Sequence, residues 1–519
     1  MRVFRLKQLT LALAVVCSFG FYMTGVSMQP QEEARPAIPK TWDDREIATH
    51  EIPLANSIGS PKHVSADYYY RIPVRPIYKG YPVYATGHEP AGYIDWLKQQ
   101  EPVVLWDDKG HAPALTSEAD WIRAGEMVFD APTTYDARGN IDDVRNPAWY
   151  EKLHVPLPKD GTVPEYQYVV RTKGKVELGA ISCANCHTRV MPDGSILKAA
   201  QSTFPVNRAA AWGFRKNAEQ AADKAAYLAQ LRAATKKLHG APWLKRDMEE
   251  RIDTMSVEEI ASLFDAIPPG LSLRHRSNSF TPIQVPDLIG LKDRRYLDRT
   301  GLEMHHNIGD LMRYAAMNQG GDYLGNFAGF IPADAPRFTQ LPPPETQRRY
   351  SDEQLYAVAL WIYSLKPPPN PNKFDAVAAR GQQVFERERC GTCHTPPLYT
   401  NNKITPADGF QIPPDHLKTY DILPVSVHTD TTLTLRTRRG TGYYKVPSLK
   451  GVWYRGMFPH DGSCATLEDW FDPNRLRDDY VPTGFKGYQV EHRAVPGHEF
   501  GLKLSSEDKK ALIAFLKTL

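Results

Sequence analysis

The chain has few cysteines, almost no net charge and little hydrophobic sequence beyond its beginning. Six cysteines stand among 519 residues, too few for a disulfide framework. The 63 basic and 60 acidic residues leave a formal net charge of +3, which gives no electrostatic reason to expect a nucleic-acid partner. Hydrophobic residues make up 42% of the chain, an ordinary share for a globular protein.

The single long apolar run lies at the N-terminus. Arg2, Arg5 and Lys7 precede a hydrophobic stretch over about 9–26. A basic region followed by an apolar core is typical of an export signal. The run is also near the length that spans a bilayer. We therefore predict that residues 1–28 are a signal peptide or an uncleaved membrane anchor, and that the rest is periplasmic or extracellular.

Four of the six cysteines stand in two C-x-x-C-H pentads. The first pentad comprises Cys183, Cys186 and His187, and the second comprises Cys390, Cys393 and His394. At this spacing two thiols lie one helical turn apart and can each bond a haem vinyl group, while the histidine becomes the proximal iron ligand. A zinc site would need ligands gathered from both pentads, some two hundred residues apart. The pentads therefore predict two covalently bound c-type haems.

Other segments also occur twice, once around each pentad. "RAGEMVF" (123–129) precedes the first pentad and "ARGQQVF" (379–385) precedes the second, and both are typical of an amphipathic helix. Fifteen-residue segments with an N-terminal serine and helical spacing of apolar residues follow each pentad, at 351–365 and 505–519. Each such segment is predicted to be a helix that closes a domain over its haem.

A third repeated motif, V-P-x-L, occurs in "VPDLIGL" (285–291) and "VPSLKGV" (446–452). The repeats predict a mainly α fold with two cytochrome c-type helical haem domains in tandem. The first domain is assigned to residues 115–366, with insertions, and the second to 374–519. A Pro-rich linker, 367–373, joins them, and an irregular Tyr- and Pro-rich extension, 29–114, precedes them.

The second half resembles the di-haem cytochrome c peroxidase and MauG superfamily. The shared features are "CGTCH", "KVPSLKGV" (445–452), "HDG" (460–462) and "TLE" (466–468). The resemblance covers about 115 to the end and is weaker in the first half. It implies a haem oxidoreductase with electron transfer between two haems.

The methionine ligand that these peroxidases place after H-D-G is missing here. His498, in "AVPGHEFG", is similar in position to a histidine ligand of the larger rubber oxygenases of the same superfamily. The resemblance thus implies His394 and His498 as the axial pair of the second haem, with Met457 as the alternative ligand. His460 and Asp461 are expected to anchor the haem loop by hydrogen bonds.

The first haem has His187 as its expected proximal ligand and no histidine soon afterwards to supply a sixth ligand. The peroxidases' W-D-G-R motif is replaced here by "YLD" (296–298). His305 and His306 precede a predicted helix and are candidates for a distal general acid–base. The alternative is that they are polar residues at a helix N-terminus.

These observations predict a peroxidase-like enzyme that reduces hydrogen peroxide at the first haem. Electrons would come through the second haem from a small donor protein, a cytochrome c or a cupredoxin. Two alternatives stay open. One is an oxygenase that uses O2 to cleave a carbon–carbon double bond, like the rubber oxygenases. The other is an electron-transfer cytochrome without a substrate.

Overall fold

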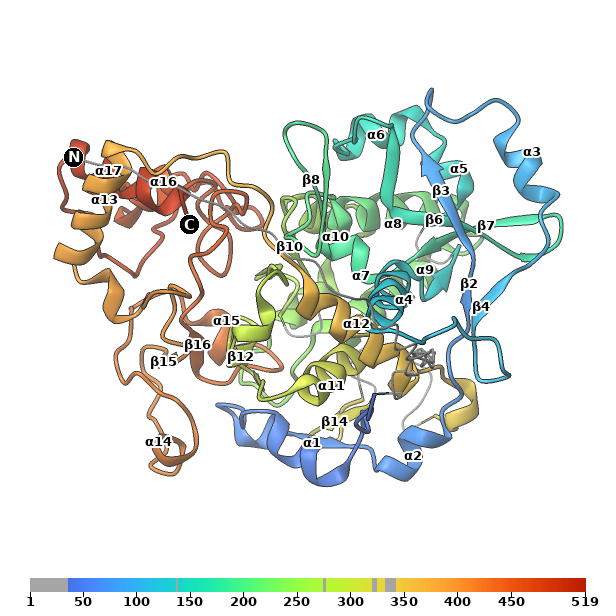
Figure 1. The fold of residues 1–519 in the computed structure, drawn as a ribbon, viewed down its shortest axis with the longest axis horizontal. Helices are drawn as coiled ribbons and strands as arrows, with labels where there is room; N and C mark the ends of the chain where they lie inside the picture. Colours follow the sequence, from blue (N-terminus) through green and yellow to red (C-terminus); the bar gives the residue numbers. More distant parts are fainter. Residues whose placement is uncertain (1–35, 137–138, 274–276, 320–323, 332–341) are drawn as a thin grey trace, which may run out of the picture. The chain divides into compact units, whose positions relative to one another are not determined.

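A computed structural model describes residues 36–136, 139–273, 277–319, 324–331 and 342–519 (Figure 1). The predicted signal or anchor segment, 1–28, lies outside these residues. Within them, no helix combines the length and the apolar character that crossing a membrane requires. Contacts group Ala37–Leu519 together as one unit, and its division into two haem domains stays a prediction.

The two pairs of helices predicted from the repeats are confirmed. In the first half α4 (Glu118–Asp130) packs on α12 (Asp352–Ser364), and in the second half α13 (Ala376–Arg387) packs on α17 (Ser506–Lys517). The serines that begin the closing segments act as N-caps. Ser351 accepts a hydrogen bond from the backbone N–H of Gln354, and Ser505 accepts one from Asp508.

Each pair of helices crosses at a glycine that occupies the same place in the repeat. A Cβ atom on Gly125 of α4 would collide with the carbonyl oxygen of Ala357 in α12. A Cβ atom on Gly381 of α13 would collide in the same way with the carbonyl oxygen of Ala511 in α17. The helices therefore touch backbone to backbone, which only glycine permits at these positions.

The repeated segments share a hydrophobic core in each half. In the first, Phe129 of α4 and Trp361 of α12 are packed with Leu288 from the V-P-D-L segment and Ala184 from the first pentad. In the second, Phe385 and Phe515 of α13 and α17 are packed with Val452 from the other V-P-x-L segment and with partly buried Cys390. Each pentad is thus attached to the core built by its own pair of helices.

The predicted fold lacks a four-stranded antiparallel sheet, three strands of which come from the segment between α4 and the first pentad. Its strands lie in the order β3 (Gly80–Tyr84), β6 (Thr162–Thr172), β7 (Lys175–Ala180) and β5 (Thr134–Tyr135). β6 contains aromatic and β-branched residues, which favour a half-buried strand. The prediction of an irregular extension is wrong here, because β3 from the extension pairs with β6.

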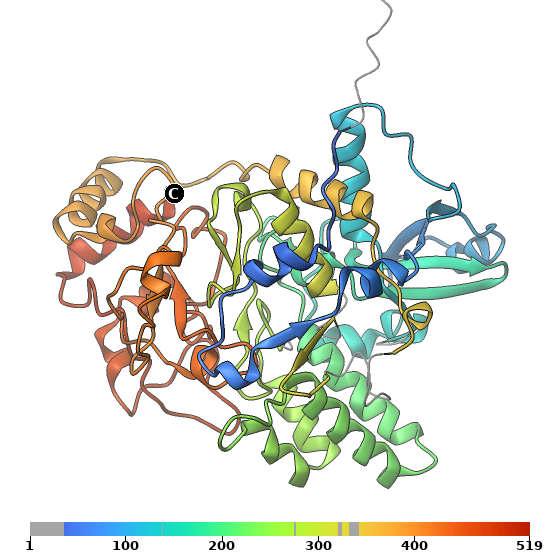
Figure 2. The ribbon, with the colours of Figure 1, turned by 90° about the horizontal axis from the view of Figure 1, so that it is seen from below.

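Three further helices follow the first pentad: α8 (Val206–Gln220), α9 (Lys224–His239) and α10 (Val257–Asp265). Figure 2 shows them in green, gathered on one side. α8 and α9 are separate helices, because α8 ends at Gln220 and Asp223 caps α9 by accepting a hydrogen bond from the backbone N–H of Ala226.

The N-terminal extension contacts the first half through short elements. The stacked rings of Trp42 and Tyr69, with centroids 4.7 Å apart, belong to a core that also contains Met317 of α11 (Ile308–Gln319). The bounds of these elements are α1 (Asp44–His50), η1 (Ser57–Gly59), β1 (Pro61–His63), α2 (Ala66–Arg71), β2 (Ile77–Tyr78), α3 (Tyr93–Lys98) and β4 (Val104–Trp106).

Short elements make up the remainder of both halves. In the first half they are α5 (Ile141–Val144), α6 (Pro147–Leu153), α7 (Cys183–His187), β8 (Thr188–Val190), β9 (Ile196–Lys198), η2 (Met248–Thr254), β10 (Leu271–Ser272), β11 (Ile283–Gln284), η3 (Leu291–Asp293), β12 (Tyr296–Leu297), β13 (Glu303–Met304), α11 (Ile308–Gln319), β14 (Gly325–Phe327) and η4 (Pro344–Thr346). In the second half they are η5 (Cys390–Thr392), β15 (Ile404–Pro406), α14 (His416–Thr419), α15 (Thr432–Leu435), β16 (Tyr443–Lys445), α16 (Leu467–Trp470) and η6 (Pro473–Leu476).

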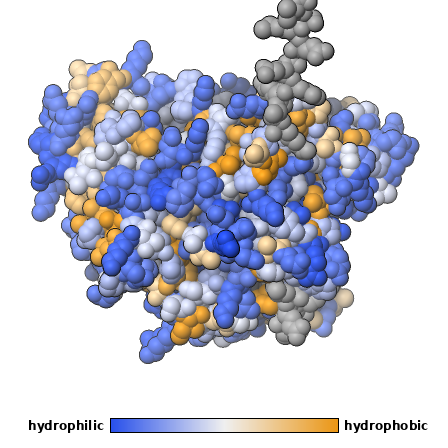
Figure 3. All heavy atoms as spheres, turned by 60° about the horizontal axis from the view of Figure 1, so that its bottom comes forward, coloured by the Kyte–Doolittle hydropathy of each residue, from blue (hydrophilic) through white to orange (hydrophobic). Residues whose placement is uncertain are grey.

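Figure 3 shows one face of the molecule, on which apolar side chains lie scattered between hydrophilic ones. Large apolar side chains that are well exposed include those of Ile58, Phe374 and Phe500. Scattered apolar residues of this kind are normal on a surface that faces water.

The helix crossing at Gly381 leads to a stability prediction. Gly381→Ala should lower the free energy of unfolding by about 2 kcal/mol or more, because the new methyl group must push α17 away. Gly213→Ala is the matched control: Gly213 also lies inside a helix, α8, but a Cβ atom there would meet nothing within 4 Å. It should be neutral or stabilising by up to about 1 kcal/mol. Equal effects of the two variants in urea unfolding would contradict the close crossing.

Candidate haem-binding sites

The second pentad directly follows α13. Its cysteines, Cys390 and Cys393, are partly buried free thiols. Burial raises the pKa of Cys390 to about 11 and also raises the pKa of Cys393, so both are neutral thiols. Partly buried cysteines beside a hydrophobic core are compatible with uncharged thioether bonds to the vinyl groups of a haem.

His394 is oriented by two backbone carbonyl groups. Its Nδ1 lies 3.3 Å from the oxygen of Tyr399 and 3.2 Å from the oxygen of Pro447. Because both partners are acceptors, Nδ1 must carry the proton, which leaves Nε2 as the nitrogen that can bind a metal. Burial lowers the pKa of His394 and so favours the neutral ring that a metal requires.

His498 faces His394 from a distant part of the chain. The centroids of the two rings are 6.2 Å apart. Nitrogen binds a transition metal at about 2 Å and lies about 1.2 Å from its ring centre, so two imidazoles on opposite sides of one iron have centroids roughly 6.4 Å apart. Burial and the neighbouring His394 lower the pKa of His498 to about 3. The pair therefore fits the axial positions of one haem, although ligation itself stays a prediction.

The loop that carries His498 is held by Arg475, whose side chain is fully buried. This guanidinium donates hydrogen bonds to the carbonyl oxygens of Trp470, Val495, Gly497 and His498, at 2.5 to 3.0 Å. His498 has a φ of 48°, a left-handed conformation that costs energy in a residue with a side chain. Arg475 is thus a positioning residue that the sequence analysis missed.

Two residues of the H-D-G motif form contacts with neighbouring side chains, and their place in a haem loop stays a prediction. The buried ring of His460 stacks on Tyr444, with centroids 4.4 Å apart, and its Nε2 is 3.2 Å from the hydroxyl of that tyrosine. Asp461 accepts hydrogen bonds from Ser463 and Arg493.

Met457, the alternative ligand, packs in a different cluster from that of the second pentad. Its neighbours there are Ile267, Leu271 and Phe485.

The first pentad forms α7, which follows directly from β7. The backbone N–H of Ser182 donates to Asn185 at 2.6 Å, and the backbone N–H of Ser202 donates to the carbonyl oxygen of Cys186 at 3.1 Å. Ala184 is buried in the core of the first half, whereas Cys183, Cys186 and the last residue of α7, His187, are partly buried. The pentad is thus held by backbone contacts on both sides, which leaves its side chains at the edge of the core.

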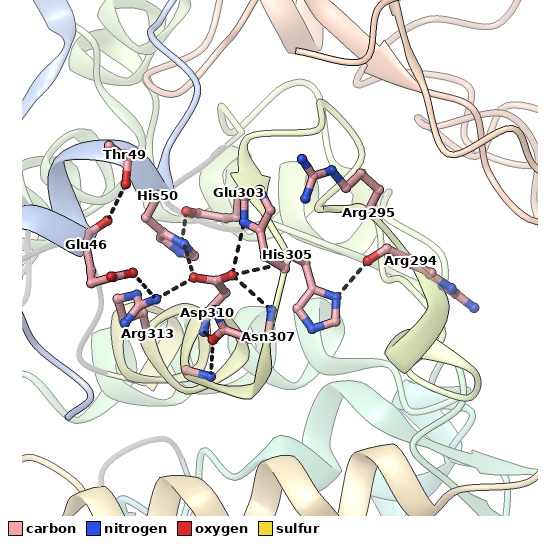
Figure 4. A network of polar contacts seen from close by, with 12 residues as sticks. Glu46, Thr49, His50, Arg294, Arg295, Glu303, His305, Asn307, Asp310 and Arg313 are labelled. Atoms are coloured by element: carbon pink, nitrogen blue, oxygen red, sulfur yellow. Dashed lines mark hydrogen bonds and ion pairs between the residues drawn. The ribbon is translucent and has the colours of Figure 1, made fainter. Parts of the chain in front are cut away.

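The two candidate distal histidines differ in their surroundings (Figure 4). His305 is buried, and its ring nitrogens lie 2.7 Å from the carbonyl oxygen of Arg294 and 2.6 Å from the hydroxyl of Tyr363. Both nitrogens are therefore engaged, which favours a structural role over acid–base catalysis. His306 is exposed, and its Nδ1 lies 3.3 Å from Asp310 at the start of α11. Among the described residues, none of these contacts reaches α7.

A buried network of charged side chains next to these histidines was not foreseen from the sequence. The ring of His50 lies 2.9 Å from a carboxylate oxygen of Glu303, and Asp310 pairs with Arg313 (Figure 4). Burial acts to raise the pKa of Asp310, but hydrogen bonding from the His306 backbone and pairing with Arg313 hold it below its usual value. Because His50 belongs to α1, the network ties the N-terminal extension to α11.

β6 contributes a second unforeseen group, the carboxyl of Glu165. Its side chain is buried, and among the described residues neither carboxyl oxygen has a hydrogen-bond partner. Burial raises its pKa to about 8, so the group is mostly protonated at neutral pH. Glu165 belongs to β6, a strand that contacts α7.

Comparisons with known proteins find only distant similarity, and only among solved structures. No protein-family model and no curated protein matches the chain. Among solved structures, the hydrazine synthase of Kuenenia stuttgartiensis is 14% identical over 56% of this chain and 87% of its own, with a TM-score of 0.29. A MauG-like protein associated with microbial copper homeostasis is 14% identical over 56% and 88%, with a TM-score of 0.28. Neither likeness identifies an activity for this chain.

No group of three or more histidine, cysteine or acidic side chains that could hold a metal ion is found in the described part of the chain. A haem needs only one histidine on each face of the iron, and the second pentad together with His498 offers that arrangement.

The charged network leads to a second stability prediction. Asp310→Asn should lower the free energy of unfolding by about 3 kcal/mol, because buried Arg313 loses an ionic partner. The control is Asp95→Asn, which breaks an exposed pair with Lys98 and should change stability hardly at all. The measurement is urea unfolding of both variants, and an Asp310 variant as stable as its control would refute the role of the network.

Proposed function

We propose that the chain is an exported c-type cytochrome with two haems that reduces hydrogen peroxide. The observation that carries the proposal is the pair His394 and His498, with ring centroids 6.2 Å apart beside a C-x-x-C-H pentad. A histidine on each side leaves no open position on the second iron. That haem is therefore assigned to electron storage and transfer, and the first haem to the reaction with substrate.

The proposed reaction consumes two electrons and two protons for each peroxide and yields two molecules of water. The haems, when bound, supply the one-electron chemistry. A small donor protein, a cytochrome c or a cupredoxin, would deliver the electrons in the compartment to which the chain is exported. A proton source near the first haem is also needed, and Glu165, a buried and mostly protonated group on a strand that contacts α7, is better suited to this than His305.

An oxygenase is the second candidate, and the contacts of His305 favour it. Both ring nitrogens of His305 are occupied by hydrogen bonds, so this histidine is not free to act as the general acid–base group expected on the distal side of the first haem. Insertion of both atoms of O2 across a carbon–carbon double bond, giving two carbonyl groups, consumes neither protons nor electrons overall. A site without a free acid–base group can therefore still suit that reaction. Peroxide-dependent oxidation of a reduced donor, compared with O2 uptake in the presence of an alkene, distinguishes the two candidates.

Removal of the first pentad's thiols tests the assignment of the two haems. The double variant Cys183→Ala/Cys186→Ala should lose peroxide turnover, and the mass of its denatured chain should show one haem instead of two. The control is Cys464→Ala, which removes a buried cysteine outside both pentads and should keep both haems and turnover. Normal turnover by the double variant would refute the assignment.

Substitution of His498 tests the ligation of the second haem. His498→Ala should convert one haem from a six-coordinate low-spin to a high-spin absorption and electron paramagnetic resonance spectrum, because one strong ligand is lost. His492→Ala changes an exposed histidine six residues earlier and should leave the spectrum unchanged. If the His498 variant keeps the low-spin signal of both haems, the proposed axial pair is wrong.

A further inference from the structure

A pocket between segments of both predicted halves is lined by five basic residues, one of which, Lys403, is exposed to solvent. Arg294 and Arg299 come from the segment between η3 and β13, and Lys445 and Arg455 come from the segment around the second V-P-x-L motif. We call these four residues the cation pocket. No sequence pattern predicts that these residues are neighbours, because about 150 residues separate the two pairs.

Backbone groups, rather than carboxylates, satisfy most of the hydrogen bonds of the cation pocket. Arg294 donates to the carbonyl oxygens of Asp287 and Ile289, at 2.9 and 2.8 Å. Arg299 donates to a carbonyl oxygen at 3.3 Å and Lys445 to another at 3.4 Å. Arg455 also donates to a carbonyl oxygen, at 2.9 Å. These bonds fix the side chains in place without neutralising their charges.

The carboxylates nearby do not balance these charges. Within the described residues, Arg294, Arg299 and Lys445 form no ion pair within 4.0 Å, and Arg455 reaches Asp287 only at 4.0 Å. That carboxylate already accepts hydrogen bonds from the hydroxyl of Tyr454 and the backbone N–H of Ile289. The pocket is therefore left with an excess of positive charge.

Like charges held together in this way are unfavourable without an anion. Burial and the charges of Arg455 and Arg294 lower the pKa of Arg299 to about 9. Burial and the neighbouring arginines also place the pKa of Lys445 well below its usual value. A bound anion with two negative charges would remove this cost.

The cation pocket also adjoins the backbone that orients His394. Pro447 lines the pocket, and its carbonyl oxygen is a hydrogen-bond partner of the ring of His394. Thr400, which follows the other carbonyl partner of that ring, lines the pocket too. An anion in the pocket would thus lie close to the backbone that orients the ring of His394.

We infer that the cation pocket binds the propionate carboxylates of the haem attached at the second pentad. The inference rests on the proposed function, because it requires that haem to be present. A haem carries two carboxylates on one edge, away from the vinyl positions that the cysteines bond. Arginine forks and an ammonium group are the side chains that recognise such carboxylates in proteins. The two halves of the chain would then share one cofactor.

The test uses the full-length protein with its haems and the variants Arg299→Gln and Lys445→Met. Resonance Raman spectra should show a shifted propionate-bending band for one haem. The ratio of reduced to oxidised second haem at a fixed potential should fall about tenfold, because nearby positive charges favour the reduced form. Lys445→Arg, which keeps the charge, should restore both properties. Arg477→Gln changes an exposed arginine paired with Asp479 and should alter neither.

Three results would overturn the inference. If both haems are attached but neither variant changes the band or the ratio, the propionates lie elsewhere, while the proposed function stands. If inorganic phosphate instead binds the unmutated holoprotein and is lost in the variants, the pocket is a site for a free anion. If the denatured chain carries no haem, the inference and the proposed function fail together.

If a variant does not fold, the inference can still be tested on the unmutated holoprotein. Infrared spectra with isotope-labelled propionates should show both carboxylates ionised at pH values below the usual range of a carboxyl group, because the cations stabilise the charged form. Propionates that titrate as they do in water would contradict the inference.

Discussion

The backbone-to-backbone crossing of two helices determines the position of each pentad. Gly125 against Ala357 and Gly381 against Ala511 let the opening helix of each half lie directly on the closing helix. The second pentad comes directly after its opening helix and the first comes after β7, and in each half the closing helix completes the core that the pentad borders. A larger residue at either glycine would move these helices apart, and with them the surface on which a haem would lie.

The second site depends on restraints from three separate segments. The V-P-x-L motif holds the ring of His394 through the carbonyl oxygen of Pro447. Arg475 holds the loop of His498 through four carbonyl oxygens, and that loop reaches across to face the pentad. All of these restraints are hydrogen bonds to backbone oxygens. The separation of the two histidines is therefore set by the fold and not by the side chains alone, which suits a site whose ligands must stay fixed during electron transfer.

The parts of this architecture that are local in sequence could be predicted, and the parts that join distant segments could not. The serine caps, the helical spacing of apolar residues and the pentads each lie within fifteen residues, and the helices form where they were expected. His498 was proposed as the partner of His394 only from a family resemblance, since no spacing links them. The pairing of β3 with β6, the network around Asp310 and the cation pocket depend on tertiary contacts that leave no periodic pattern.

The ligands and the cation pocket would act on the second haem in opposite directions. Replacement of a methionine ligand by a histidine lowers the reduction potential of a haem. Positive charges near the haem stabilise its reduced form and raise that potential. His498 and the pair Arg299 and Lys445 therefore oppose each other, and the haem would be a weaker oxidant than one with methionine but a stronger one than an isolated bis-histidine haem. Such an intermediate potential would suit the proposed function, in which this centre accepts electrons from a donor protein and releases them to the first haem.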